Sequence, residues 1–397
     1  MTLKICENVI KAIIFLSLLC LDKKYFLYPI DIHPFYKKKK PIISKDKSQN
    51  ETLIKGRNFL DKCLNIPNNN TYKYIKKPRA SVIMPLYNCE KTIEHSIRSI
   101  QYQNMTKVEI ILVNDFSKDN TSKIIKEIQK NDKRIKIVNN HENKGTLYSR
   151  SLGVLFSKGK YIFNLDNDDM YFDYDVFDIM CKKLRRTDLD AVGFLTVNLY
   201  NYTANISRMK NIYSYQYKNE LFLNKSRLST WIIKFKGKFL VHNNMIWDKC
   251  IKSKIYKKAI YKMGIARITK KISWAEDTSI IFLIFKIAKS FLYVHKYGMA
   301  HFKGNTTATF TQPIESRIYG DIFFLDLIFD FTKNKDKNLV VGQAIYIYKR
   351  YNFNKFINDR NSIYLRFVLN KIIKCEYLNE LNRRKIKKIF SEFFIKK

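Results

Sequence analysis

Four short apolar runs, with stretches of helical spacing after the first three, constrain the fold of this chain more than any other feature. The runs occupy residues 81–84, 108–113, 135–138 and 161–165. Between them apolar residues recur three and four positions apart, as at Ile93, Ile97 and Ile100. Strands that alternate with helices in this way form right-handed βαβ units and a mostly parallel sheet. We therefore predict an α/β fold, a Rossmann-like sandwich of helices around that sheet, with a further strand at 191–198.

The segments outside this α/β pattern have a different composition. Residues 22–78 are rich in lysine and proline and hold no long apolar period, so we expect a stalk or a loosely packed lead-in there. Beyond residue 311 the apolar spacing is helical again, which predicts a helical C-terminal extension over 311–397. The helical spacing covers residues 345–348, 367–373 and 386–394.

An apolar run from Ala12 to Leu21 completes the N-terminal segment 1–78. Its ten residues are too few to cross a bilayer, which takes about 20. The run has the length of a signal-peptide core, but Glu7 and Lys11 weaken it and no small-x-small cleavage site follows. A signal, a weak anchor and a packed helix all stay open. The short run favours the packed helix, and a cytoplasmic location over a membrane-associated or secretory one.

The formal charge of +39 ordinarily indicates an acidic partner, such as nucleic acid, an anionic membrane or a phosphorylated ligand. The basic residues are spread along the whole chain, with no zinc-finger spacing, basic region joined to heptads, or aromatic RNA-binding strand. We therefore expect a nucleotide diphosphate as the anion that is attracted, with no nucleic acid, and a peripheral membrane contact stays open. The 7 cysteines form no CxxC pair, so neither a disulfide framework nor a zinc site is expected.

Acidic residues follow the fourth apolar run directly, at 166–169. On an extended backbone Asp166 and Asp168 lie on one side, where two carboxylates can share a divalent cation such as Mg²⁺ or Mn²⁺. A turn with Asp169 as a helix cap is the alternative, and it is the better interpretation when the cluster is taken alone. A second acidic residue, Asp115, follows the second apolar run and could accept a hydrogen bond from a nucleobase or a ribose.

Four motifs in a fixed order give these residues a context. They are the segments 81–88 (SVIMPLYN), 112–121 (LVNDFSKDNT), 143–150 (NKGTLYSR) and 159–169 (GKYIFNLDNDD). Their order and spacing closely resemble those of the family 2 glycosyltransferases, which have the GT-A fold. The resemblance implies a GT-A domain over 79–310, with a nucleotide half at 79–170 and an acceptor half at 171–310. One position departs from the family pattern, because Phe116 stands where a glycine is common and constrains the turn.

The resemblance also implies a role for each matching residue. For metal binding it implies Asp168 as the leading ligand, with Asp166 and His301 as further ligands of Mn²⁺ or Mg²⁺. For nucleotide binding the implied residues are Pro85, Tyr87, Asn88, Asp115, Gly145, Arg150 and Asp166.

A later segment, Ser273–Thr278, resembles the family's x-Glu-Asp motif. In that motif the second acid, here Asp277 after Glu276, is the general base, because an acceptor hydroxyl must lose a proton as it attacks the anomeric carbon. An acidic pair that stabilises a helix N-terminus is the local alternative. Just before it, Trp247-Asp248-Lys249 resembles another family element, in which we expect Trp247 to be a packing residue.

Together these features predict an inverting, metal-dependent glycosyltransferase. The favoured donor is a UDP-sugar, and the acceptor is a hydroxyl group of a glycan, a lipid or a protein. Two alternatives stay open: a catalytically inactive nucleotide-sugar-binding homologue, and a basic protein that binds membranes or nucleic acid peripherally.

Overall fold

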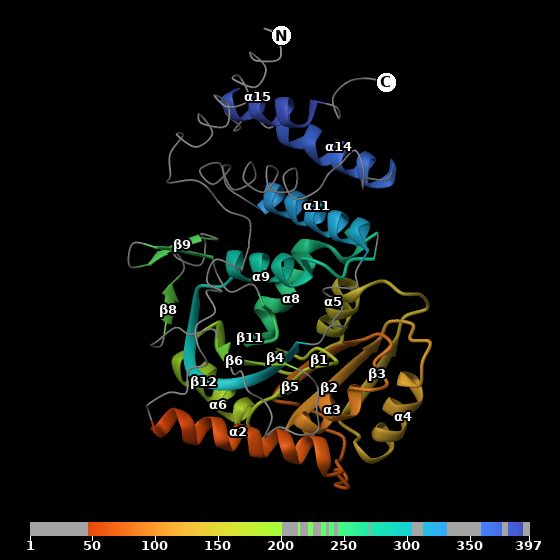
Figure 1. Cartoon of the computed structure of the whole chain (residues 1–397), viewed down its shortest axis with the longest axis vertical. Coiled ribbons are helices and arrows are strands. Elements are labelled where there is room, and N and C mark those ends of the chain that lie inside the picture. Colours follow the sequence, from red (N-terminus) through yellow and green to blue (C-terminus); the bar gives the residue numbers. More distant parts are fainter. Residues whose placement is uncertain are drawn as a thin grey trace, which may run out of the picture. The chain divides into compact units, whose positions relative to one another are not determined.

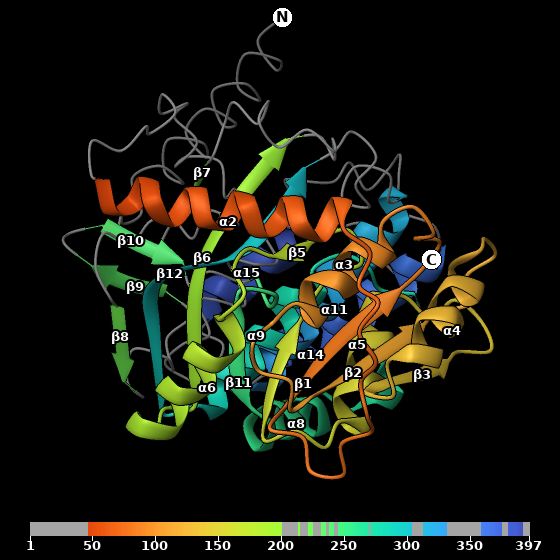
Figure 2. The same ribbon diagram turned by 90° about the horizontal axis from the view of Figure 1, so that it is seen from below.

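The computed structural model describes residues 47–200, 213–214, 221–224, 232–235, 238–241, 245–269, 271–303, 313–331, 359–374 and 380–391. Figures 1 and 2 show the chain in two views. The described residues divide into two compact units, one that ends at Gly320 and one that begins at Asp321. The expected helix at 345–348 and the apolar run at 12–21 lie outside the described residues.

Four parallel strands form one half of the main sheet, in the order β3-β2-β1-β4. Their bounds are β1 Ala80–Leu86, β2 Val108–Asn114, β3 Ile135–Asn139 and β4 Tyr161–Asn164. Every residue of β1, β2 and β4 is buried, as expected for strands covered on both faces. The four strands predicted from the apolar runs are confirmed.

Three helices join these strands and cover both faces of this half of the sheet (Figure 2). They are α3 Ile93–Gln101, α4 Thr121–Asn131 and α5 Thr146–Phe156. Ile97 of α3 and Ile125 of α4 share a core cluster with Val82 of β1. On the other face, Gly153 of α5 lies against Ile83. The alternation along β1 therefore places α3 and α4 on one face and α5 on the other.

The second half of the sheet is mixed rather than parallel. Strand β11 (Lys249–Lys252) runs antiparallel between β4 and β6 (Ala191–Tyr200), which confirms the predicted strand at 191–198. Strand β12 (Ser290–Lys303) is parallel to β6 and antiparallel to β5 (Met170–Tyr171). The short strands are β7 Tyr213–Ser214 on β6, β8 Leu221–Asn224 on β12, and the separate pair β9 Ile232–Phe235 and β10 Lys238–Val241.

A 19-residue helix, α2 (Lys47–Asn65), occupies part of the expected stalk, so that expectation is wrong for this stretch. Leu60 and Cys63 are fully buried in a cluster with Val197 and Ala300. Arg98 donates to the carbonyl oxygens of residues 63 and 64, which satisfies part of the helix C-terminus. The buried stripe of α2 includes a glycine and a cysteine, at positions 56 and 63, which carry little apolar signal among its many charged residues.

The remaining helices are α6 Val176–Thr187, α8 Ser253–Met263, α9 Glu276–Ile287, α11 Ile314–Phe331, α14 Asp359–Ile373 and α15 Glu380–Ile389. Helix α14 confirms the helical spacing at 367–373, and α15 ends within the last predicted stretch, 386–394. In the unit that begins at Asp321, Lys371 pairs with Asp326 at 2.8 Å. Among the helices that the structure describes, none combines the length and the apolarity needed to cross a membrane.

Candidate active site

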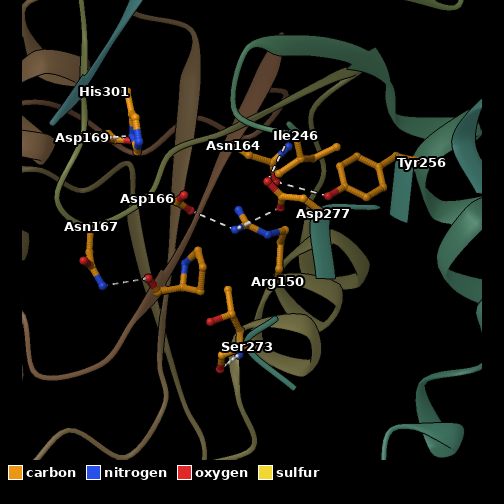
Figure 3. A network of polar contacts seen from close by, with 12 residues as sticks. Arg150, Asn164, Asp166, Asn167, Asp169, Ile246, Tyr256, Ser273, Asp277 and His301 are labelled. Carbon is orange, nitrogen blue, oxygen red and sulfur yellow. Dashed lines mark hydrogen bonds and ion pairs between the residues drawn. The ribbon is translucent and has the colours of Figure 1, made fainter. Parts of the chain in front are cut away.

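The segments that the sequence singles out meet at one edge of the sheet. Because β1, β2, β3 and β4 are parallel, the residues that follow them lie together beyond their carboxyl ends. Tyr87, Asp115, Asn140 and Asp166 all come within two residues of a strand end. Pro85, near the end of β1, accepts a hydrogen bond at its carbonyl from the Asn167 side chain at 3.5 Å (Figure 3).

Asp115 is buried and holds the loop that precedes α5. Its carboxylate accepts hydrogen bonds from the side chain of Asn140 at 2.7 Å and from the backbone N–H groups of Lys144 and Gly145 at 2.8 and 2.7 Å. A carboxylate offers about four acceptor positions, so three are taken within the protein. The contact of Asp115 with a base stays a prediction, and the Asp115 carboxylate has little acceptor capacity left for it.

The turn after β2 keeps a left-handed backbone although it lacks the family's glycine. Phe116 has φ 65° and is 39% exposed, and this conformation costs a non-glycine residue about 1 kcal/mol. Asn88 supports the turn, because its N–H donates to Ser117 Oγ and its Oδ1 accepts from the N–H of Lys118. Tyr87 nearby is 43% exposed, as a stacking surface for a base would be. Phe116 therefore puts a strained backbone conformation in this turn.

Gly145 lets the nucleotide half approach the segment that leads to Asp277. Its φ is 85°, and a Cβ atom there would lie 2.6 Å from the backbone nitrogen of Ile272. The next two residues bond to the same segment, since the N–H of Thr146 donates to Ser273 Oγ and that of Leu147 to the carbonyl of Ile272. The glycine is thus required by both conformation and space.

We expect Gly145→Ala to destabilise the protein by about 1–3 kcal/mol, and by more than Gly264→Ala. Gly264 is the matched control because its φ of 75° is equally strained for alanine, while its nearest neighbour is the flexible Arg267 side chain at 3.5 Å. Urea unfolding of both variants measures the difference. Equal losses would show that the contact with Ile272 adds nothing.

Arg150 joins the acidic cluster after β4 to the x-Glu-Asp segment. Its side chain is fully buried, and its Nη2 lies 2.8 Å from Asp166 Oδ1 and 3.6 Å from Asp277 Oδ1 (Figure 3). Asp277 Oδ2 also accepts the N–H of Ile246 at 3.2 Å. Just before α9, Ala275 has φ 56°, a strained conformation of the kind that clusters at functional sites. The structure therefore brings together three residues that the sequence predicted separately.

Three carboxyl groups at this site have raised pKa values. Burial raises the pKa of Asp277 to about 8, although the Arg150 guanidinium opposes the rise. Burial, followed by the charges of Asp169 and Asp166, raises the pKa of Asp168 to about 7. Burial also raises the pKa of Glu276. Carboxyl groups whose pKa values are raised together are typical of a catalytic or binding site.

Residues 166–169 form a turn rather than the extended segment that was expected, and the N–H of Asp169 donates to the carbonyl of Asp166 at 3.2 Å. Asp169 is not a helix cap either, because strand β5 follows it. Its buried carboxylate lies 3.0 Å from Nδ1 of His301 and accepts the N–H of Phe302. The His301 ring stacks on Trp247, with centroids 5.1 Å apart. A carboxylate that fixes Nδ1 orients the imidazole for ligation through Nε2.

The side chains of Asp166, Asp168 and His301 fit a cation whose remaining ligands are phosphate oxygens of a substrate. In the part of the chain that the structure describes, no three His, Cys, Asp or Glu side chains are grouped so that they could hold a metal by themselves. Burial raises the pKa of Asp168 first, and the charges of Asp169 and Asp166 raise it further. A bound cation would relieve this repulsion between the carboxylates. Mg²⁺ in particular is often bound by one or two carboxylates together with phosphate oxygens.

Sequence patterns missed three contacts of this site. Ile246 takes part through its backbone N–H, which no side-chain pattern can reveal. Tyr256 of α8 donates to Asn164 Oδ1 at 3.2 Å, beside the cluster. Asn164 lies in the motif at 159–169, but Tyr256 belongs to no recognised motif. The pairing of Asp169 with His301 links residues from different motifs, so only the fold could reveal it.

Residues 81–261 match the model of "Glycosyl transferase family 2". The chain is 37% identical over 117 residues to EpsJ, an uncharacterised glycosyltransferase of Bacillus subtilis. This match covers 29% of this chain and 33% of that protein. It is 44% identical over 93 residues to an uncharacterised glycosyltransferase of Haemophilus influenzae, and this match covers 23% of this chain and 29% of that protein. The chain thus spans about a third of the length of these curated relatives.

Among solved structures, S. aureus TarS 1-349 in complex with UDP-GlcNAc is similar, with a TM-score of 0.55. The match covers 80% of this chain and 89% of that chain, at 14% sequence identity. At this low sequence identity the similarity shows the fold alone. The similarity agrees with the predicted GT-A fold.

Proposed function

Since residues 81–261 form a family 2 glycosyltransferase domain, we propose that the chain transfers a sugar from a nucleoside diphosphate sugar to an acceptor hydroxyl group. The favoured donor is a UDP-sugar, in line with the UDP-GlcNAc bound by TarS. The acceptor belongs to a glycan, a lipid or a protein.

One observation carries this proposal, namely the bridge that Arg150 makes between Asp166 and Asp277. It joins the donor side of the site to the base side in one buried cluster. The Nε and Nη1 atoms of Arg150 are buried and have no hydrogen-bond partner among the described residues. Buried donors of this kind ordinarily bind water or a ligand, so Arg150 also suits the nucleotide-binding role.

In the proposed reaction Asp277 accepts the proton of the acceptor hydroxyl as that oxygen attacks the anomeric carbon. The bond from the anomeric carbon to the acceptor oxygen forms while the bond to the diphosphate oxygen breaks on the opposite side, and the configuration inverts. The raised pKa of Asp277 suits a general base that works near neutral pH. Glu276, beside it, adds a second carboxyl group whose pKa is also raised by burial.

We assign the metal ligands to Asp168 first, with Asp166 and His301 beside it. A divalent cation, Mn²⁺ or Mg²⁺, supplies positive charge against the departing diphosphate when it is bound there. Asp169 holds the His301 ring at Nδ1, and Trp247 packs flat against it, so both residues orient the imidazole.

Thermal unfolding with UDP and Mn²⁺ tests the shared metal site. We expect Mn²⁺ alone to stabilise the protein little, and UDP with Mn²⁺ to stabilise it more than UDP with chelator, because the cation needs phosphate oxygens to complete its shell. A ligand at 100 times its Kd adds ~2.7 kcal/mol. Asp168→Asn should remove the Mn²⁺-dependent part, and Asp188→Asn, an exposed acid outside the site, should not. If a chelator leaves the stabilisation by UDP unchanged, this metal site is excluded.

A catalytically inactive nucleotide-sugar-binding protein is the second candidate. The strained turn at Phe116 and the near-saturated carboxylate of Asp115 favour it, because both lie where the base is expected to bind. Incubation with a panel of nucleotide sugars and acceptors separates the two. Stabilisation by a donor without release of its nucleoside diphosphate would support the inactive homologue.

A further inference from the structure

We propose that Lys249 is a positioning residue that fixes the peptide group between Met245 and Ile246, and through it the general base Asp277. The inference rests on the proposed function, because it assigns Lys249 a task in sugar transfer. The general base is held from one side by Arg150, as described above. Lys249 controls its contact on the other side.

Lys249 opens β11 and is fully buried, which is rare for a lysine. Its Nζ donates to the carbonyl oxygen of Met245 and pairs with Asp248 Oδ1 at 2.6 Å. Asp248 is also buried, and its Oδ2 accepts a hydrogen bond from the Tyr293 hydroxyl at 3.3 Å. The ammonium group is therefore anchored to β12 through Asp248 and Tyr293.

The carbonyl that Lys249 binds and the N–H that Asp277 accepts belong to one peptide group. That group consists of the C=O of Met245 and the N–H of Ile246, and the N–H donates to Asp277 Oδ2 at 3.2 Å. Peptide groups are planar and rigid, so fixing the oxygen fixes the direction of the N–H. A cation at the oxygen also polarises the group and strengthens its N–H as a donor.

The same turn supports the other side of the site. Trp247 lies between Ile246 and Asp248 in the sequence, and it stacks on His301 at an interplanar angle of 15°. One short segment, Met245–Lys249, thus contacts both the base and the histidine assigned to the metal. The segment is attached to the sheet where the N–H of Phe194 donates to the carbonyl of Asp248.

A buried ion pair is poor evidence for stability, because apolar residues of similar volume often pack as well or better. The Lys249–Asp248 pair costs the desolvation of two charges. Its distinctive contribution is a fixed peptide direction next to Asp277, which an apolar side chain cannot supply. This is the reason to assign it a positioning role.

Lys249→Met tests the proposal with Lys252→Met as the matched control. Lys252 lies on the same strand, is 8% exposed and pairs with the exposed Asp188 and the mostly buried Asp190, so its loss also removes a mostly buried cation from acidic partners. We expect Lys249→Met to lower kcat on the order of 10- to 100-fold, the cost of misplacing a catalytic group. The KM for the donor should change by no more than about twofold, because ground-state binding of the donor is untouched. Lys252→Met should leave kcat unchanged.

Tyr293→Phe keeps the ring and removes only the hydroxyl group that holds Asp248, so it tests the network if Lys249→Met does not fold. We expect a fall in kcat of about threefold with an unchanged donor KM. Amide hydrogen exchange at Ile246 provides a readout that needs no turnover. The exchange should accelerate in Lys249→Met or Tyr293→Phe and not in Lys252→Met.

Unchanged protection of the Ile246 amide in folded variants overturns the proposal, as does an unchanged kcat. A wild-type protein that transfers no sugar overturns the proposed function instead. In that case faster exchange at Ile246 still shows that Lys249 fixes the peptide group, so the two failures are distinguishable.

Discussion

Asp277→Asn should abolish sugar transfer and spare donor binding. We expect kcat to fall by about 10²–10⁴-fold, the usual contribution of a general base, because asparagine cannot accept the proton of the acceptor hydroxyl. The Kd for UDP should stay within about threefold, since the substitution is isosteric and lies on the base side of the site. Product formation measures the first effect, and titration calorimetry with UDP measures the second.

Asp178→Asn is the matched control, because Asp178 also lies in the first turn of a helix, α6. An acid there stabilises the helix dipole by about 0.3–1 kcal/mol. If Asp277 acted only in this way, the two variants would lose similar stability and keep their turnover. Turnover retained in Asp277→Asn would exclude it as the base.

The raised pKa of Asp277 predicts how activity and stability depend on pH in the wild type and in Asp277→Asn. The base works when it is deprotonated, so kcat/KM of the wild type should rise with pH toward about 8 and flatten in Asp277→Asn. For stability the sign is opposite. A folded-state pKa above the unfolded value means that the native state binds the proton more tightly. This stabilisation is fully present below the ordinary pKa of 3.8 and is lost progressively as the pH rises from there to about 8. Above that pH, Asp277→Asn should be at least as stable as the wild type.

Arg150→Met should cost both stability and function. Removing one partner from a buried ion pair costs about 3–5 kcal/mol, because the remaining charge loses its compensation; we expect the lower end, since Asp166 is partly exposed. UDP binding should also weaken, because the donor-side carboxylate loses its fixed position. Urea unfolding and UDP titration measure the two effects.

Arg134→Met provides the comparison for Arg150→Met. Arg134 is equally buried and pairs with Asp132 at 2.7 Å, outside the site. Arg134→Met should lose at least as much stability, because Asp132 is fully buried, and it should keep its UDP affinity and its turnover. If Arg150→Met behaves in the same way, the bridge to Asp277 is structural only.

The sequence predicted the fold and the members of the site better than it predicted their contacts. Apolar periodicity located the parallel strands, because burial on both faces leaves a continuous apolar run. It missed α2, because the buried residues of that helix are few and lie among many charged ones. The motifs brought Asp166 and Asp277 into the same hypothesis, but only packing places the Arg150 guanidinium between them. The contribution of Ile246 is a backbone N–H, which is independent of residue type.

The reversed strand β11 determines what kind of chemical group reaches the catalytic edge. Strands β4 and β6 leave the sheet there and deliver side chains, whereas β11, antiparallel to both, enters from there. The turn before β11 therefore brings the N–H of Ile246 and the indole ring of Trp247 to this edge. In a wholly parallel sheet, only segments that follow a strand would lie there. Because the pairing of Cys250 with Phe163 fixes the register of β11, the turn that carries this N–H and this ring is held in place by the sheet itself.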